Sequence, residues 1–179
     1  MASDEELYAR TRRGDMRAFD ALYARYETKL FGFILRQLQD RAEAEDVLHE
    51  TIMNALKSRE IDFDRAAFRT WLFRIARNLV LNRLGGEARR RRALSKMEAE
   101  PSVAPADRSL ELAERQQALR HAVGTLPQPL AEVYHLRSAG LSYQEMAHVL
   151  EIPLGTLKSR MNAMVMRLRG ELSSWTVPS

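Results

Sequence analysis

The segment from Leu141 to Arg160 constrains the fold of this chain most, because it predicts two short helices joined by a tight turn. Ser142 and Glu145 have the spacing of a capping box, in which each side chain bonds the other residue's backbone N–H. Pro153 suits the first turn of the second helix, where a missing N–H loses no partner. This pattern is typical of a helix-turn-helix, whose second helix lies in the major groove of DNA.

The second helix of this motif is expected to have one buried and one exposed side. Leu157, Met161, Leu168 and either Met164 or Val165 recur at helical spacing and are expected to face inward. Lys158 and Arg160 can bind phosphates or guanine, and hydroxyl and amide side chains can bond base edges. The candidate DNA-binding residues are therefore Thr156, Lys158, Ser159, Arg160 and Asn162. The alternative interpretation is that Lys158 and Arg160 only solvate a surface helix.

The composition narrows the classes of function. Hydrophobic residues make up 45% of the chain, enough for a core, and the sequence pI of about 9.7 fits a nucleic-acid partner. Eight arginines and the single Glu87 lie between residues 66 and 92, a local excess that indicates a phosphate-binding surface. The absence of Cys excludes disulfides and thiolate metal sites, and it fits a reducing compartment.

The sequence predicts a soluble, cytoplasmic protein without catalytic chemistry. The acidic N-terminus has no apolar segment typical of a secretory signal, and no apolar run approaches about 18 residues. His49, His121, His135 and His148 lack metal-ligand spacing, and no glycine-rich phosphate loop or paired nucleophile is present. We therefore expect no metal, no cofactor, no small-molecule substrate and no enzyme activity.

Almost every periodic segment before the motif has helical spacing. Ser3 and Glu6 predict a capping box for a short first helix, and Gly14 followed by Asp15 predicts a break. Asp40 is expected to cap a later helix. The predicted inward residues of the long helix between them are Leu22, Tyr23, Tyr26, Leu30, Phe33 and Ile34. Those of the helix after Asp40 are Leu48, Ile52 and Leu56.

A further helix is predicted after a polar loop at residues 58–65. Its inward stripe comprises Phe68, Trp71, Leu72, Ile75 and Leu79, and Gly85 with Gly86 is expected to end or loosen it. Two prolines and weak periodicity then indicate a flexible linker. The fold class is all-α, with a helical domain at residues 1–93, a linker at 94–107, and a domain carrying the helix-turn-helix at 108–179.

The polar sides of these helices hold the other candidate sites. Asp46 and Glu50 form an acidic stripe with Glu43, Asn54 and Lys57, suited either to docking on a basic helix of another protein or to plain solvation. Opposite the stripe of the later helix lie Arg74, Arg77, Asn78 and Asn82, which can follow phosphates and pair with exposed bases. Arg89 to Arg92 are expected to bind phosphate backbone without reading sequence, or to serve only as a solubilising run.

Three groups of residues resemble the extracytoplasmic-function class of bacterial sigma factors. The first is Ala44 to Thr51 and the second is Phe68 to Leu79. The third comprises Leu126-Pro127, Gly140 to Tyr143 and Pro153 to Arg160. The resemblance covers most of the chain in the order and spacing of that class. It implies a factor that binds core RNA polymerase, melts the −10 promoter element with its first domain and binds the −35 element as duplex with its second.

The resemblance also implies roles for individual residues. Asp46, His49 and Glu50 would contact the polymerase clamp, although His49 stands where the class often has an amide. The −10 residues would be Arg74, Arg77, Asn78, Asn82 and Phe63, the last in a loop that holds a flipped base. A core role for Phe63 is the alternative. The −35 residues would be those at the start of the second helix of the motif. An anti-sigma factor, often membrane-bound in the class, would be a further partner.

The recognition helix departs from the class after Arg160. Further arginines are usual there, whereas this chain continues Met161 to Met166, with fewer charges and more methionine for adaptable contacts. We therefore expect a weaker phosphate grip and a different −35 sequence. Two alternative functions remain open from the sequence: a self-standing helix-turn-helix regulator, and a sigma-like decoy that binds an anti-sigma factor.

Overall fold

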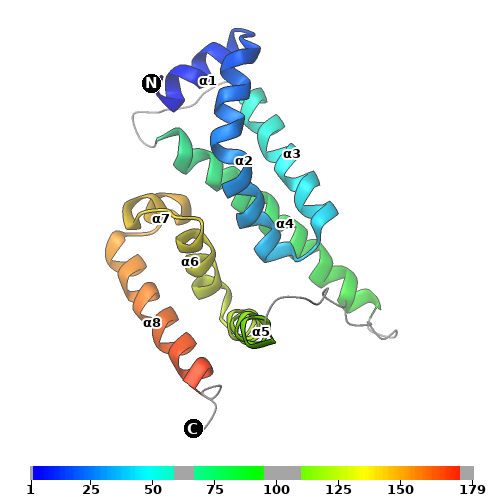
Figure 1. The fold of residues 1–179 in the computed structure, drawn as a ribbon, viewed down its shortest axis with the longest axis vertical. Coiled ribbons are helices and arrows are strands. Elements are labelled where there is room, and N and C mark those ends of the chain that lie inside the picture. The colour runs from blue at the N-terminus through cyan, green and yellow to red at the C-terminus, as the bar shows by residue number, and fades with distance from the viewer. Residues whose placement is uncertain (1, 59–66, 95–109, 174–179) are drawn as a thin grey trace.

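The computed structural model describes residues 2–58, 67–94 and 110–173, and within these ranges it has eight helices and no strand. The all-α prediction is therefore confirmed. Figure 1 shows two groups of helices. The N-terminal module comprises α1 (Asp4–Arg12), α2 (Met16–Leu38), α3 (Arg41–Lys57) and α4 (Phe68–Leu94). The C-terminal module comprises α5 (Leu110–Gly124), α6 (Gln128–Ser138), α7 (Tyr143–Leu150) and α8 (Leu154–Ser173). Most of the expected linker lies outside the described residues.

The predicted helix starts are confirmed. Both capping boxes form, Ser3 with Glu6 at α1 and Ser142 with Glu145 at α7, so each pair satisfies two backbone N–H groups that a helix start leaves free. The side chains of Asp15 and Asp40 cap α2 and α3. Local side-chain chemistry therefore sets where α1, α2, α3 and α7 begin.

The core of the N-terminal module lies between α2 and α4. From the predicted stripe of α2, Leu22, Tyr26, Leu30, Phe33 and Ile34 are buried, whereas Tyr23 is only half-buried. The α4 stripe is broader than predicted, because Phe73 and Val80 are fully buried as well. The ring of Phe73 meets that of Phe33 edge-on, with centroids 5.4 Å apart. Aromatic pairs favour this arrangement.

The predicted end of α4 at Gly85 and Gly86 is wrong. The helix continues through both glycines to Leu94. A glycine costs about 1 kcal/mol relative to alanine within a helix, and the neighbouring Leu84, Ala88 and arginines are good helix formers. The favourable propensity on both sides thus carries the helix across the pair.

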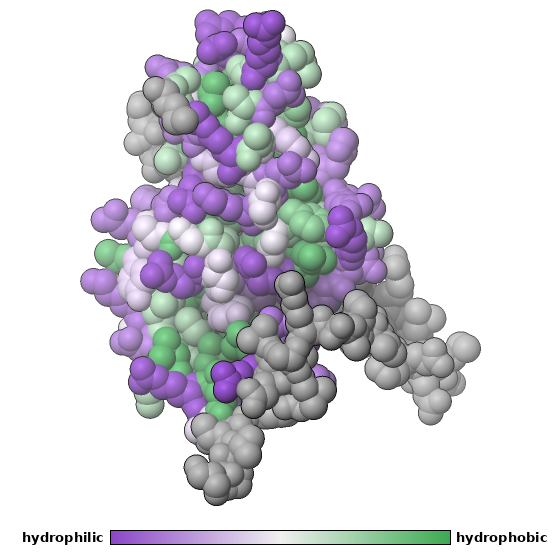
Figure 2. Space-filling view, in the orientation of Figure 1, coloured by the Kyte–Doolittle hydropathy of each residue, from purple (hydrophilic) through white to green (hydrophobic). Residues whose placement is uncertain are grey.

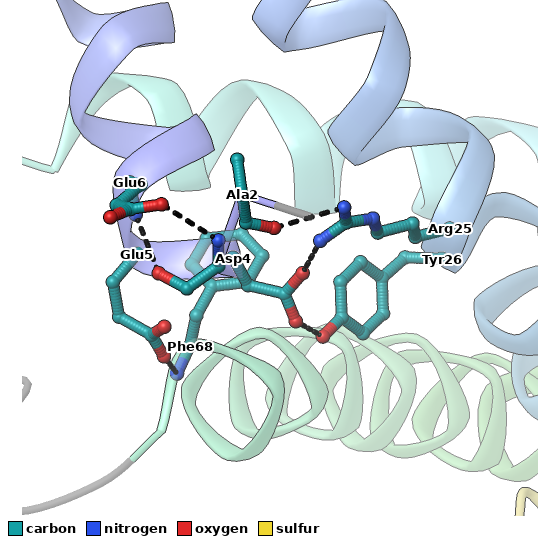
Figure 3. Close-up of polar contacts among 8 residues, drawn as sticks. Ala2, Asp4, Glu5, Glu6, Arg25, Tyr26 and Phe68 are labelled. Atoms are coloured by element: carbon teal, nitrogen blue, oxygen red, sulfur yellow. Dashed lines mark hydrogen bonds and ion pairs between the residues drawn. The ribbon is translucent and has the colours of Figure 1, made fainter.

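A polar network fastens α1 to α2 and α4 (Figure 3). Asp4 accepts hydrogen bonds from Arg25, at 2.6 Å, and from the hydroxyl of Tyr26. Burial and the bond to Asp4 raise the pKa of the Tyr26 phenol, so this hydroxyl keeps its proton. Glu5 accepts the backbone N–H of Phe68 at 3.1 Å. The first helix therefore fixes the start of α4.

The core of the C-terminal module is built around the helix-turn-helix. Its fully buried side chains are Val133, Leu136, Leu141, Met146, Val149 and Leu157. Gly140 ends the turn after α6 with a φ of +82°. Glycine adopts this conformation readily, whereas residues with a Cβ adopt it only at a cost in free energy. The chain then enters α7, which packs against α8.

The two modules pack against each other. Helix α4 contacts α7, and α2 contacts α6, so one continuous hydrophobic cluster spans both modules. Figure 1 shows α6 and α7 beside α2 and α4, with α8 on the outer side of the C-terminal module. The sequence predicted two domains and a flexible linker, but it did not predict that the two modules share an interface. No helix in the described ranges has the length and hydropathy needed to cross a membrane.

Candidate nucleic-acid interface

The leading end of α8 presents the predicted polar side to solvent. Thr156, Lys158, Ser159 and Asn162 are exposed, and Arg160 is half-buried at the edge of the helix. On the opposite side Leu157, Met161 and Met164 are buried, as predicted. This geometry leaves the candidate side chains able to reach a DNA groove without disturbing the core.

The methionines of α8 present less surface than the sequence indicates. Met161 and Met164 fill the core, and only Met166 is largely exposed, at 68%. The Ser159 hydroxyl donates to the carbonyl of Gly155 at 3.1 Å within its own helix. Its oxygen therefore remains an acceptor for a base edge or a water molecule.

The arginine side of α4 is not free, because it faces the C-terminal module. Arg74 pairs with Glu151 at 3.0 Å, and the Nε of Arg77 donates to Glu132 at 2.7 Å. Arg69, outside the predicted set, pairs with Glu145 at 3.3 Å and donates to the carbonyl of Gly140 at 3.0 Å. Candidate phosphate-binding groups are thus neutralised by carboxylates of the other module.

These ion pairs differ in their surroundings. The side chains of Arg77 and Glu132 are only 21% and 10% exposed, so their pair is largely shielded from water. Arg74 and Glu151 are 43% and 69% exposed, and such pairs contribute little. Breaking a shielded pair leaves an uncompensated buried charge, so losing one partner of the Arg77–Glu132 pair should cost more than losing one partner of the Arg74–Glu151 pair.

The other predicted −10 residues fall into two groups. Asn78 and Asn82 are exposed, and the amide oxygen of Asn78 lies 3.4 Å from Arg77. Phe63 lies outside the described residues. Arg89 to Arg92 belong to the last turns of α4, but their side chains lie outside the description.

The acidic stripe of α3 is on the surface, as predicted. Asp46 and His49 are exposed. Glu50 is half-buried and pairs with Arg83 of α4 at 3.4 Å, so its charge is partly used within the module. Asp46 and His49 therefore remain the more accessible of the three predicted polymerase contacts.

The predicted inner side of α3 is partly wrong. The buried residues are Ala44, Val47, Leu48, Thr51 and Ala55, whereas Ile52 and Leu56 are only half-buried. The small residues Ala44 and Ala55 let α3 lie close to its neighbours, which turns the larger Ile52 and Leu56 toward α2.

A groove of about 610 Å³ lies between α2 and α3. Its apolar lining comprises Phe19, Tyr23, Phe31, Leu48, Ile52, Met53 and Leu56, and His49 lies at its edge. Figure 2 shows that hydrophobic residues gather in a few places on this mostly hydrophilic face. Helix α3 thus contributes both to the lining of the groove and to the acidic stripe.

Sequence reasoning missed the acids that close the arginine side of α4. Glu132 stands in a mostly apolar run, Leu130 to Leu136, which was a sign of a buried acid in need of a partner. Nothing in the sequence named Arg77, 55 positions away, as that partner. The sequence did not indicate a distant partner for Glu145 or Glu151, because a capping role explains the first and a surface position explains the second.

The C-terminal module also holds a buried histidine against α2. His135 is 8% exposed, and its Nδ1 has no hydrogen-bond partner within the described residues. Burial, with a smaller contribution from the positive charge of Arg36, lowers the pKa of His135 to about 4. No group of acids and histidines among the described residues has the geometry of a metal site.

Comparisons with known proteins bear on both modules. Residues 22–90 match the family model for sigma-70 region 2. The RNA polymerase sigma-H factor of Pseudomonas aeruginosa is 34% identical, in a match that covers 88% of this chain and 87% of that protein. The ECF RNA polymerase sigma-E factor of Haemophilus influenzae is 31% identical over 88% of this chain and 89% of its own length.

Two solved structures share the fold. CnrH, in complex with the cytosolic domain of CnrY, superposes with a TM-score of 0.72 at 23% identity, covering 97% of this chain and 99% of that chain. The sigma factor RpoE of Bartonella quintana, in complex with the anti-sigma factor NepR, gives a TM-score of 0.67 at 24% identity, covering 87% of this chain and 96% of that chain.

Proposed function

The chain belongs to the extracytoplasmic-function class of RNA polymerase sigma factors, and we propose that it directs core RNA polymerase to promoters through two separate DNA contacts. It acts as an initiation factor with no catalytic role of its own, in the cytoplasm where polymerase and promoter DNA meet. The observation that carries this proposal is the exposed polar side of α8 above a buried apolar side.

The C-terminal module supplies the −35 contact in this proposal. Lys158 and Arg160 bind phosphates or guanine, and Ser159 and Asn162 bond base edges, with Thr156 at the start of the helix. The exposure of the leading end of α8 supports these roles. Because Met161 and Met164 are buried in the core, the −35 contact depends on these few polar groups.

The N-terminal module supplies the −10 contact. Arg74 and Arg77 follow the phosphates of the opened strand, and Asn78 and Asn82 bond unstacked bases. Phe63, which precedes α4 in the sequence, stacks on a flipped base. Unstacking a base costs a few kcal/mol, so these contacts must return that energy. The location of the four described residues on one side of a rigid helix supports a shared role.

The exposed side of α3 supplies the contact with polymerase. Asp46 and His49, with Glu50 beside them, dock on a basic helix of the polymerase clamp. The neighbouring apolar groove offers hydrophobic contact next to this charge. Such a combination of apolar centre and charged rim is typical of protein interfaces.

An anti-sigma factor is the proposed regulatory partner. The Bartonella quintana relative in fold was solved with the anti-sigma factor NepR, which supports the same class of partner for this chain. The groove between α2 and α3 fits an amphipathic helix of such a partner.

Transcription with purified components tests the proposal. Core polymerase with this chain and fragmented genomic DNA of the source organism should give transcripts that start at a defined set of sites and are absent without the chain. The double variant Asp46→Ala/His49→Ala should reduce co-purification with core polymerase, whereas Asp20→Ala, an exposed acid on α2, should not. Duplex binding without polymerase association would instead favour a self-standing regulator.

Association with an anti-sigma factor but with neither polymerase nor DNA would favour the decoy function. In either case the assignment of a promoter-directing role would be overturned.

A further inference from the structure

The proposed −10 surface on α4 and the proposed −35 surface on α8 differ in whether their basic side chains are already paired within the chain. On α4, Arg74 and Arg77 are paired with carboxylates of the C-terminal module. On α8, Lys158 and Ser159 are exposed at the leading end of the helix. The chain therefore presents the −35 surface freely, whereas carboxylates of the C-terminal module occupy the two arginines of the −10 surface and leave Asn78 and Asn82 exposed.

The pair between Arg77 and Glu132 places a carboxylate on a group suited to phosphate. A guanidinium binds carboxylate and phosphate oxygens with the same N–H donors, so it cannot serve both fully at once. Because this pair is largely shielded from water, salt screens it weakly. Glu132 thus occupies the Nε donor of Arg77, one of the donors that a phosphate would use.

Two further contacts hold the same surfaces together. Arg69 binds both Glu145 and the carbonyl of Gly140, so it fixes the start of α7 and the turn before it. The Nε of Arg69 is buried and has no hydrogen-bond partner among the described residues. The hydrophobic cluster that spans both modules lies behind these bonds. The interface thus combines apolar burial with specific charge pairing.

The packed arrangement is too short for both promoter elements. Sites named −10 and −35 lie roughly 25 base pairs apart, on the order of 80 Å at about 34–36 Å per helical turn. The 20-residue helix α8 is only about 30 Å long, and α7 next to it touches α4. The two modules must therefore separate before both elements can be bound.

We propose that the chain locks itself: Glu132 occupies Arg77 and, with the Arg69 contacts, holds the C-terminal module over the −10 surface until the modules are separated. This inference rests on the proposed −10 role of α4. It makes separation of the modules a distinct step between the free factor and the form that opens DNA. The −35 surface needs no such step.

The distance between the modules tests the lock without polymerase or promoter. The chain has no cysteine, so the exposed positions Ala24 of α2 and Met166 of α8 can be changed to Cys and spin-labelled in the full chain. The parent should give one narrow distance distribution. Glu132→Gln removes the charge but keeps the shape, and it should shift the distribution to longer and broader distances. Asp20→Asn is the matched control and should leave it unchanged.

A mixed-sequence single-stranded oligonucleotide supplies the second measurement. In low salt, Glu132→Gln should bind it about five- to tenfold more tightly than the parent, with a salt dependence of log K steeper by about 0.7 for each phosphate gained. Should Glu132→Gln fail to fold by circular dichroism, Glu145→Gln/Glu151→Gln replaces it, because both side chains are partly exposed and glutamine also fits a capping box.

The lock requires both changes together. A broad, long distance in the parent, an unchanged distance in the variant, or an unchanged affinity for the oligonucleotide would each overturn it. Because neither measurement uses polymerase, failure of the lock leaves the transcription assay intact. Failure of that assay would leave the measured distance between the modules unaffected, but it would remove the −10 role on which the lock rests.

Discussion

The carboxylate of Glu5 accepts a hydrogen bond from the backbone N–H of Phe68 over 3.1 Å, so the first helix of the chain caps the fourth. The first N–H groups of a helix have no partner within it, and a negative charge there also favours the helix dipole. The residue before α4 is Ala67, whose side chain cannot accept a hydrogen bond and so cannot cap the helix. Tertiary structure therefore supplies the cap at the start of the proposed −10 helix (Figure 3).

Replacing Glu5 with alanine should weaken the start of α4. Loss of a side-chain cap costs about 1 kcal/mol, so we expect the free energy of unfolding to fall by roughly that amount. Urea unfolding followed by circular dichroism measures the change. Glu45→Ala removes an exposed glutamate that pairs with Arg41 within its own helix, and it should cost only a few tenths of a kcal/mol. Equal losses in the two variants would refute the capping role.

Acid should destabilise the chain through His135. Its pKa is about 4 in the folded chain against about 6.5 when unfolded, so between these values the unfolded state binds more protons. The contribution is constant above pH 6.5, and stability is lost as pH falls from there toward 4, by on the order of 1–3 kcal/mol. Unfolding at a series of pH values measures this slope.

The leucine variant isolates that contribution. His135→Leu removes the titrating group and the unpaired Nδ1, so its stability should depend less on pH across this window than that of the parent. His148→Gln, at an exposed position of α7, should keep the parent slope. A leucine variant with the parent slope would assign the acid sensitivity to other groups.

Asn78 should be needed for strand opening but not for the packing of the modules. Asn78→Ala leaves the Arg77–Glu132 pair in place and removes one base contact, worth about 1–3 kcal/mol. Permanganate reactivity of promoter thymines should fall, while polymerase binding stays at the parent level. Gln116→Ala, an exposed amide on α5, is the control. Unchanged reactivity would remove Asn78 from the −10 surface.

Arg77→Ala should behave differently from Asn78→Ala. It removes a proposed phosphate contact and also frees Glu132, so both strand opening and the narrow distance between the modules should be lost. A variant that loses opening but keeps that distance would show that Arg77 serves DNA alone.

Lys158 and Ser159 should affect −35 binding in distinguishable ways. Lys158→Ala should weaken binding to all duplexes alike and reduce the salt slope by about 1, as expected for a phosphate contact. Ser159→Ala should cost about 1–3 kcal/mol only on the preferred sequence. Fluorescence anisotropy on promoter and scrambled duplexes at several salt concentrations measures both. Arg169→Ala, farther along the same helix, should leave base preference unchanged.

Several features were predictable because their causes are local. Two capping boxes, the caps of α2 and α3, and the exposed side of α8 follow from residues three or four positions apart. The inner side of α3 was less predictable, because the small Ala44 and Ala55 became core while Ile52 turned toward the groove. Hydrophobicity indicates burial, but the closeness of neighbouring helices decides which side is buried.

The sequence by itself determined the helical periodicity, the starting points of α1, α2, α3 and α7, the helix-turn-helix and the family, since these depend on short-range spacing and on motifs. Only the tertiary structure decided that Arg69, Arg74 and Arg77 meet carboxylates of the other module. A charged residue could pair with many residues that are distant in the sequence. Only the packing of α4 on α7 brings these arginines and carboxylates within bonding distance.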